Sequence, residues 1–175
     1  SVGAGTSPGT FNNTFNSGAT ISKAIDAPSA DSVETHDQTT HIWFTATNPG
    51  GGLELAFDFV QSYDITTLHF WNYTAEDYDV DNIDFTFFDA TNAQVGALSI
   101  QPDLGTSPGI TAQDIDLAAP LNVRFVTAFL TGSNQQVDFQ NMGFTAEMSV
   151  VPAPGGLLLL ATGIVALAVR AIRRG

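Results

Sequence analysis

Alternating hydrophobic and polar positions dominate the middle of the chain. The stretch LELAFDF at 53–59 puts its large apolar side chains on one face and its two acidic side chains on the other, which is the period of two that a half-buried β-strand shows. IDFTFFDA at 83–90 and NVRFVTAFL at 122–130 repeat the pattern. The side chains that this alternation directs toward one face of each strand are Leu53, Leu55, Phe57, Phe59, Ile83, Phe85, Phe87, Val123, Phe125, Thr127 and Phe129.

Turn-forming residues separate these strands. Segments rich in Gly, Pro, Asn and Asp lie between them, and no amphipathic helical pattern occurs before residue 150. Short strands with this spacing predict an all-β fold, an antiparallel β-sandwich (jelly roll), with the 13 phenylalanines filling the space between two sheets. We expect a Gly/Ser/Thr/Asn-rich arm or loose first strand over 1–19 and the β-sandwich domain over 20–149.

The C-terminal pattern is different. Residues 155–169 carry no charge and one polar side chain, Thr162. A helix from Pro154 to Ile172 would span roughly 28 Å, close to the ~30 Å hydrocarbon core of a bilayer. Polar positions do not recur at a helical period, so a buried helix of a soluble domain is the less favoured alternative. We therefore expect one C-terminal transmembrane α-helix within 150–175, with its arginines in the cytoplasm and the sandwich outside.

Charge is distributed unevenly along the chain. Residues 1–149 hold all 18 Asp and Glu residues, whereas Lys23 and Arg124 are the two basic side chains before the C-terminal arginines. A body this acidic repels nucleic-acid phosphates, so we expect no nucleic-acid partner. Cations, basic proteins and neutral sugars are the partners that this charge favours. The chain has no cysteine, which excludes disulfides and thiolate metal sites.

The three parts of the C-terminus, in their order, resemble the PEP-CTERM sorting signal of Gram-negative bacteria. Val-Pro-Ala-Pro precedes the apolar span, and arginines close the chain, with Ala where the family pattern has Glu. The resemblance implies an exported protein at the bacterial inner membrane, with a periplasmic β-domain and a cytoplasmic C-terminus. It also implies an exosortase partner and, after processing, the cell surface. The implied anchor and sorting residues are Val151, Pro152, Ala153, Pro154, Gly156, Gly163, Arg170, Arg173 and Arg174.

The body of the chain resembles the discoidin-like, galactose-binding-type jelly roll of the coagulation-factor type C family. Residues 24–59 contain an Ala-x-Asp, a Thr-x-x-Trp and a first central strand, and YDITTLHFWNYT and FQNMGFTAEMSV are similar to later strands of that family. The resemblance implies the same sandwich and a structural Ca²⁺ held by Asp26, Thr40 and Glu147, the one cofactor we consider. The alternative is that Asp26 caps a turn and Glu147 is solvated.

Two further residue groups are candidate sites. Asp77, Asp79 and Asp81 share one face of an extended strand and would repel one another unless a cation lay among them; a solvated acidic loop is the alternative. The tripeptide Trp71-Asn72-Tyr73 offers rings and an amide for a sugar ligand, although aromatic side chains of a β-rich chain also fill cores.

Neither the histidines nor any common catalytic motif points to an enzyme. His36 and His41 lie in a loop-like segment without a metal-binding spacing, and we expect them at the surface. The sequence contains no nucleophile-elbow motif, no phosphate-binding glycine loop and no His-Glu-x-x-His. We therefore expect a non-enzymatic protein.

Two functions remain open. In the first, the chain is a membrane-anchored binding or scaffold protein of the bacterial envelope, with surface polysaccharide as its partner. In the second, it is a structural accessory subunit of a photosynthetic or respiratory inner-membrane complex. Its helix would then lie at the periphery of that complex, with Gly156, Gly163 and Ala166 as a small-residue stripe for helix contact, and the sandwich would cap the periplasmic face.

Overall fold

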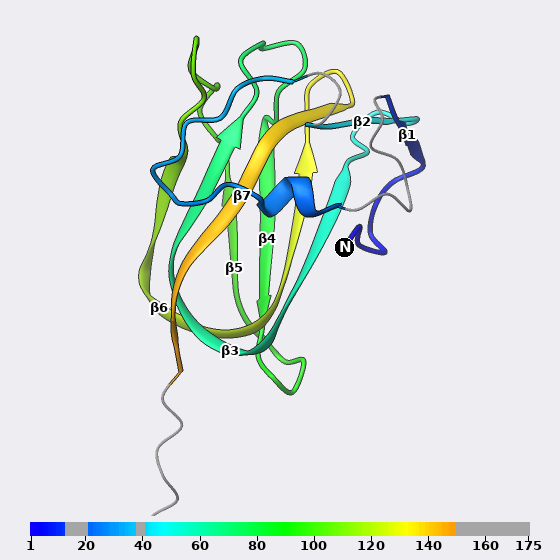
Figure 1. The fold of residues 1–175 in the computed structure, drawn as a ribbon. Helices are drawn as coiled ribbons and strands as arrows, with labels where there is room; N and C mark the ends of the chain where they lie inside the picture. The colour runs from blue at the N-terminus through cyan, green and yellow to red at the C-terminus, as the bar shows by residue number, and fades with distance from the viewer. Residues whose placement is uncertain (13–20, 38–40, 150–175) are drawn as a thin grey trace, which may run out of the picture.

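Over the residues that the structure describes, the architecture is an antiparallel β-sandwich with almost no helix, as the alternation predicts (Figure 1). The computed structural model describes residues 1–12, 21–37 and 41–149. Its elements are β1 (Gly9–Phe11), the 3₁₀ turn η1 (Ile21–Ile25), β2 (Ile42–Ala46), β3 (Leu53–Asn72), β4 (Asn82–Phe88), β5 (Gln94–Ile100), β6 (Gln113–Thr131) and β7 (Gln136–Met148).

Two long strands connect the layers of the sandwich. The hydrogen-bonded order is β1-β2-β7-β3-β6-β4-β5, and every pair is antiparallel. The first half of β3 pairs with the second half of β6, which also pairs with β4. The second half of β3 pairs with the first half of β6 and with β7. Figure 1 shows both strands bending sharply between these halves.

The bend of β3 combines a break in strand register with a residue of positive φ. The register with β6 breaks between Asp58 and Tyr63. Within this break Val60 has a φ of 66° and is 82% exposed. A β-branched residue rarely adopts a positive φ, because its side chain crowds the backbone there. The bend therefore forms at a strained, solvent-facing position.

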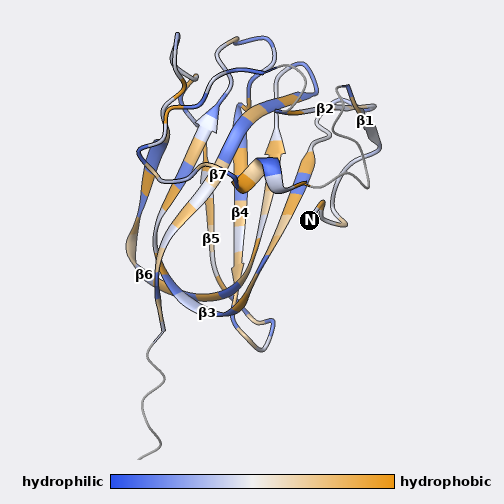
Figure 2. Ribbon diagram, in the orientation of Figure 1, coloured by the Kyte–Doolittle hydropathy of each residue, from blue (hydrophilic) through white to orange (hydrophobic). Residues whose placement is uncertain are grey.

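The core is mainly aromatic and aliphatic. Phe44, Phe70, Phe85, Phe87 and Phe139 are each at most 2% exposed and belong to one continuous cluster with Leu, Ile and Val side chains. Figure 2 shows hydrophobic and hydrophilic positions interleaved along the strands that supply them. This arrangement confirms the core-facing positions predicted in 83–90 and the first two in 53–59, Leu53 and Leu55.

The prediction for 122–130 was only partly right. Val123 is buried, but the remaining core positions of β6 are Val126, Ala128 and Leu130, whereas Phe125 and Phe129 are partly exposed. The buried positions 123 and 126 are three residues apart along the chain, which does not fit a period of two. The alternation therefore slips by one residue at the bend, where β6 passes from one layer to the other.

The N-terminal arm joins the sheet as an edge strand. β1 pairs with β2 in the register Gly9↔Ala46. A Cβ atom at Gly9 would lie 2.4 Å from the backbone oxygen of Thr45, so this close approach needs glycine.

The expected membrane anchor lies outside the described residues. Residues 150–175, which include every anchor and sorting position from Val151 to Arg174, are among those the structure does not describe. Within 1–12, 21–37 and 41–149, no helix is long and apolar enough to cross a membrane.

Candidate functional site

The three residues predicted to contact sugar face different surroundings. Trp71 is 1% exposed, and its Nε1–H donates to the carbonyl oxygen of Ser32 at 2.8 Å. Asn72 is 3% exposed, and its Nδ2 donates to the carbonyl oxygens of Val80 and Asp103 at 3.0 Å each. The hydrogen-bonding groups of Trp71 and Asn72 therefore fasten loops to β3. The prediction is corrected for these two residues, since burial removes their polar groups from a ligand.

Tyr73 instead belongs to a group of rings beside the C-terminal end of β3. This end cluster consists of His36, His41, Trp43, Tyr73 and Tyr78. The His36 ring lies 4.5 Å from that of His41 and 4.6 Å from that of Tyr73. The His41 ring stacks at 6.2 Å on Trp43 and on Tyr73, and Trp43 meets Tyr78 edge-on at 6.5 Å. Five rings from three segments thus form one continuous group.

Strand alternation places these side chains on the outer face of β2 and β7. In β2, Ile42 and Phe44 point into the core, so Trp43 points outward. Trp43 is paired with Asp138 of β7. His36 and the two tyrosines come from the connections that lie over this face. His41 is fully buried, Tyr78 is 42% exposed, and the other rings are partly exposed.

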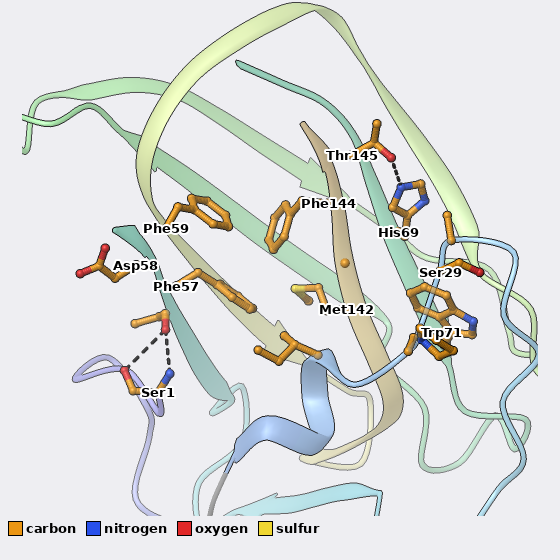
Figure 3. Close-up of a pocket in the computed structure, with 16 residues that line it drawn as sticks. Ser1, Ser29, Phe57, Asp58, Phe59, His69, Trp71, Met142, Phe144 and Thr145 are labelled. Carbon is orange, nitrogen blue, oxygen red and sulfur yellow. Dashed lines mark hydrogen bonds between the residues drawn. The ribbon is translucent and has the colours of Figure 1, made fainter. Parts of the chain in front are cut away.

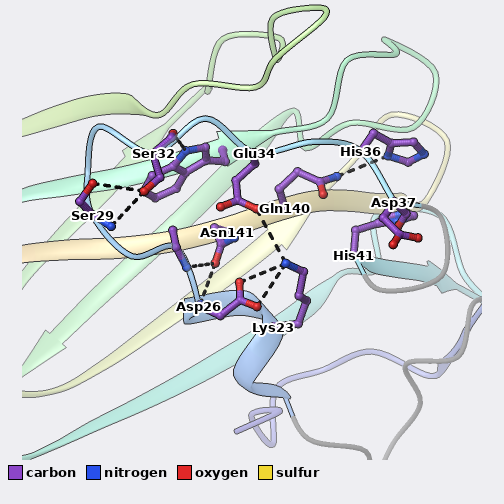
Figure 4. A network of polar contacts seen from close by, with 12 residues as sticks. Lys23, Asp26, Ser29, Ser32, Glu34, His36, Asp37, His41, Gln140 and Asn141 are labelled. Atoms are coloured by element: carbon purple, nitrogen blue, oxygen red, sulfur yellow. Dashed lines mark hydrogen bonds and ion pairs between the residues drawn. The ribbon is translucent and has the colours of Figure 1, made fainter.

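Polar groups lie beneath the rings. His41 Nε2 lies 2.9 Å from Asp138 Oδ1, and its Nδ1 bonds to the carbonyl oxygen of Asp37. Gln140 Nε2 lies 3.4 Å from His36 Nδ1, an interaction visible in Figure 4. Asp138 and Gln140 are 3% and 1% exposed. The end cluster therefore combines partly exposed rings with fixed, buried hydrogen-bonding groups.

Burial and charge pairing set the protonation of this cluster. Burial disfavours the imidazolium of His41, but the Asp138 carboxylate and the Asp37 carbonyl outweigh it and raise the His41 pKa above its usual value. Burial raises the pKa of Asp138, and His41 opposes that shift. Burial and the neighbouring His41 lower the pKa of His36. The cluster therefore concentrates positive charge on His41 and leaves the His36 ring neutral more often.

The structure does not bring the predicted calcium ligands together. The backbone N–H of Asp26 donates to Asn141 Oδ1 in the middle of β7, while its carboxylate accepts from Lys23 at 3.2 Å. Glu147 is exposed and lies six residues further along β7 than Asn141, a span of about 20 Å at the rise of a strand. Thr40 lies outside the described residues. The segment that follows η1 meets β7 at Asn141, and not at Glu147 as the resemblance implies.

Asp77, Asp79 and Asp81 have separate partners. Asp79 is 5% exposed and accepts from Asn72 Nδ2 at 3.2 Å. Asp81 accepts from the backbone N–H of Ser133, and the backbone carbonyl of Asp77 accepts from Asn134 Nδ2 at 2.8 Å. Among the described residues no three His, Cys, Asp or Glu side chains could hold a metal ion together. The prediction of a shared cation is corrected: the segment 77–81 is fastened to the β6–β7 turn.

The surroundings of Asp79 favour the protonated form of its carboxyl group. Burial, followed by the negative charges of Asp81 and Glu76, raises its pKa to about 6. A carboxyl with this pKa is partly protonated near neutral pH, which lowers the repulsion within the acidic segment.

The end cluster was missed from the sequence for an identifiable reason. We expected His36 and His41 at the surface, yet His41 is fully buried. The sequence feature that relates to this cluster is QVDFQ at 136–140, in which polar residues alternate with the core residues of β7. This pattern predicts a solvated face, and only the loop folded over it turns Asp138 and Gln140 into buried groups.

Comparisons with known proteins establish the fold. The sequence matches no family model and no curated protein. The fold is similar to that of a fucose-binding module from Streptococcus pneumoniae, with a TM-score of 0.54 and 13% identity over 81% of this chain and 92% of that one. It is similar to the lectin domain of lectinolysin complexed with Lewis B antigen (0.51, 14% identity, 82% and 94%). It is also similar to a fragment of a putative chitobiase from Bacteroides thetaiotaomicron (0.51, 13%, 76% and 78%).

These likenesses confirm the antiparallel β-sandwich expected from the sequence. The similarity extends over nearly the whole of the fucose-binding module and of the lectin domain. At identities this low, the shared property is the fold.

Proposed function

We propose that the chain is a non-enzymatic carbohydrate-binding module and that the end cluster is its binding site. The observation that carries this proposal is the arrangement of the partly exposed rings of His36, Trp43, Tyr73 and Tyr78 over the buried Asp138 and Gln140. A sugar ring has an apolar face of C–H groups and a rim of hydroxyls. Rings supply a surface for that face, and the partly exposed polar atoms of these rings bind the hydroxyls, while the buried Asp138 and Gln140 hold the two histidines in place.

Charge narrows the class of sugar to neutral saccharides. Asp37 and Asp138 lie in or beside the cluster, and Asp77 follows in the same connection as Tyr73. An anionic sugar such as a uronic or sialic acid would meet carboxylates here, which costs binding free energy. The fold neighbours include a fucose-binding module and a lectin domain complexed with Lewis B antigen. Fucose and Lewis B antigen are therefore the first ligands to test.

Substitutions at Tyr73 test the proposal. Calorimetric titration of the chain should detect a neutral saccharide, and Tyr73→Ala should weaken that binding at least tenfold, because it removes a central ring. Tyr73→Phe should retain most of the affinity, since the ring remains. Tyr63→Ala is the matched control, because Tyr63 lies at the bend of β3 and contacts Phe59. Equal affinities for the Tyr73→Ala variant and the unaltered chain would reject the end cluster as the site.

The cellular location of the module depends on the role of the C-terminal segment 150–175. With the predicted anchor, the module would be displayed on the periplasmic side of a bacterial inner membrane, where surface polysaccharide is accessible. The accessory-subunit hypothesis requires that the anchor is retained. The intact mass of the protein from its native membranes distinguishes the two hypotheses. A mass that corresponds to a chain ending at Gly175 supports retention of the anchor. A mass that corresponds to a chain ending near Pro154 supports processing by an exosortase and rejects a permanent subunit.

A further inference from the structure

Strand β5 forms an open edge of the sandwich. It is the last strand in the hydrogen-bonded order, and among the described residues it pairs only with β4. The irregularity in this pairing lies near the connecting turn, between Phe87 and Phe88, so the register is regular from Gly96 to Ile100. An edge strand presents a row of N–H and C=O groups on its unpaired side. The segment from Gly96 to Ile100 can therefore accept a further strand.

Other strand edges of the described chain are bordered by further segments or are short. The N-terminal arm borders the first half of β3, where the Gly3 N–H donates to the carbonyl oxygen of Glu54 at 2.7 Å. Beside the second half of β7 lie η1 and the segment that follows it, as Figure 3 shows near Met142. The backbone N–H of Asp26 in that segment donates to Asn141 Oδ1 at 2.9 Å. Strand β1, at the other end of the strand order, has three residues.

The edge formed by the first half of β6 carries residues that discourage strand addition. Asp114 and Asp116 are exposed there, and Pro120 has no N–H to donate. Charged side chains and proline are the usual means by which a protein protects an edge strand from pairing with another chain. Strand β5 contains neither a charged residue nor a proline. Its edge is therefore both open and unprotected.

The two faces of β5 differ in polarity. Leu98 and Ile100 pack against the hydrophobic core but remain partly exposed. Gly96 shares their face, because side chains alternate along a strand. Ala97 and Ser99 lie on the opposite, outer face and are exposed. The open edge thus leaves apolar surface uncovered on its inner face and carries small, uncharged side chains on its outer face.

We propose that β5 pairs antiparallel with β5 of a second copy of this chain, about a two-fold axis beside Leu98. This register brings the two Leu98 side chains together on the inner face and sets Gly96 opposite Ile100 of the second copy. On the outer face Ala97 lies opposite Ser99 of the second copy. The contact pairs the open backbone groups of both strands and covers the partly exposed apolar side chains of the inner face.

Charge favours a second copy as the occupant of this edge. The chain has a net charge of −13, so two copies repel each other where their acidic surfaces meet. Residues 90–102 hold no Asp, Glu, Lys or Arg, so the two strands pair without like charges facing each other. A strongly charged partner strand would find no counter-charge in β5. The contact uses no residue of the end cluster, which lies in β2, in the segment before β2 and after β3.

Spin labels test this contact, because the chain has no cysteine of its own. A nitroxide is attached to the full-length Ala97→Cys variant in detergent, and the dipolar broadening of its EPR spectrum is measured. Most spins should be broadened, and a tenfold excess of unlabelled chain should reduce the broadened fraction at least fivefold. The matched control is Thr10→Cys, an exposed position on β1, which should show no broadening. No broadening at Ala97→Cys, or equal broadening at both positions, would overturn the proposal.

A charge added to β5 should weaken the pair. Ala97→Glu places a carboxylate opposite Ser99 of the second copy, which lies beside Asp84 of that copy, so it should raise the dissociation constant of the dimer at least tenfold in analytical ultracentrifugation. Thr10→Glu adds the same charge at β1 and should leave the constant unchanged. If the two variants dimerise equally well, β5 is not the contact. Tyr73→Ala should not change dimerisation, and Ala97→Glu should not change saccharide binding, so the two proposals fail independently.

Discussion

His41 Nε2 lies 2.9 Å from Asp138 Oδ1, and both side chains are almost completely removed from solvent. Asp138 lies on β7, and His41 immediately precedes β2, which pairs with β7. The pair therefore joins the loop before β2 to the sheet that supports the end cluster. A buried ion pair contributes little net free energy by itself, but removal of one partner leaves a buried group without its counter-charge.

Loss of His41 should destabilise the protein strongly. His41→Ala leaves the Asp138 carboxyl buried without its partner, so we expect the free energy of unfolding to fall by about 3–5 kcal/mol. His36→Ala is the matched control, because the His36 ring is partly exposed, and it should cost about 1 kcal/mol or less. Chemical denaturation at neutral pH measures both changes. A His41→Ala variant as stable as the His36→Ala variant would show that the pair does not hold the loop.

Asp79 should make the protein less stable as the pH rises. Its pKa is about 6 in the folded protein and 3.8 in the reference state. Below pH 3.8 the carboxyl is protonated in both states, and as the pH rises toward 6 the unfolded chain releases the proton while the folded chain retains it. Folding therefore loses up to about 3 kcal/mol across this interval.

Replacement of Asp79 by asparagine tests that sign. Asp79→Asn keeps an acceptor for Asn72 but cannot ionise, so at pH 7 it should raise the free energy of unfolding by about 2 kcal/mol. The difference from the unaltered chain should vanish at pH 3.5. Asp77→Asn is the control, because Asp77 bonds to Asn134 through its backbone carbonyl, and it should change the pH profile little. A gain that persists at pH 3.5 would contradict ionisation as the cause.

Val60 should be replaceable by glycine with a gain in stability. Val60 has a φ of 66° and is 82% exposed at the bend of β3. Glycine relieves the strain of a β-branched side chain at positive φ, which outweighs the greater freedom of the unfolded chain. We expect Val60→Gly to raise the melting temperature, with a gain of about 0.5–1 kcal/mol.

The control for Val60 is a valine in regular strand geometry. Val95 lies in β5, is 38% exposed and is not among the residues with positive φ. Val95→Gly should lower the melting temperature, because glycine weakens a strand. If both valine variants lose stability to the same extent, the bend does not depend on strain at Val60.

Much of the fold could be predicted from the sequence. The period of two in 53–59 and 83–90 is a local property of the pleated strand, and it correctly places Leu53, Leu55, Ile83, Phe85 and Phe87 in the core. The same reasoning was wrong for Phe125 and Phe129. Their phase depends on where β6 bends between layers, and no local pattern marks that position.

The candidate site was predicted less well. Of Trp71, Asn72 and Tyr73, only Tyr73 lies in the end cluster, since the burial of the other two depends on the loops that fold over β3. His36 is five residues from His41, yet Asp138 and Gln140 reach them only through the pairing of β2 with β7.

By itself, the sequence determined the all-β class, the acidic character of the body and the absence of cysteine chemistry, because each follows from composition or from neighbouring residues. Tertiary structure decided which polar residues are buried and which rings meet. Thr145, His69 and Asp114 come from three strands far apart in the sequence, and strand register alone places them within hydrogen-bonding distance. Register depends on the packing of the whole sandwich, so such groupings emerge only in the folded chain.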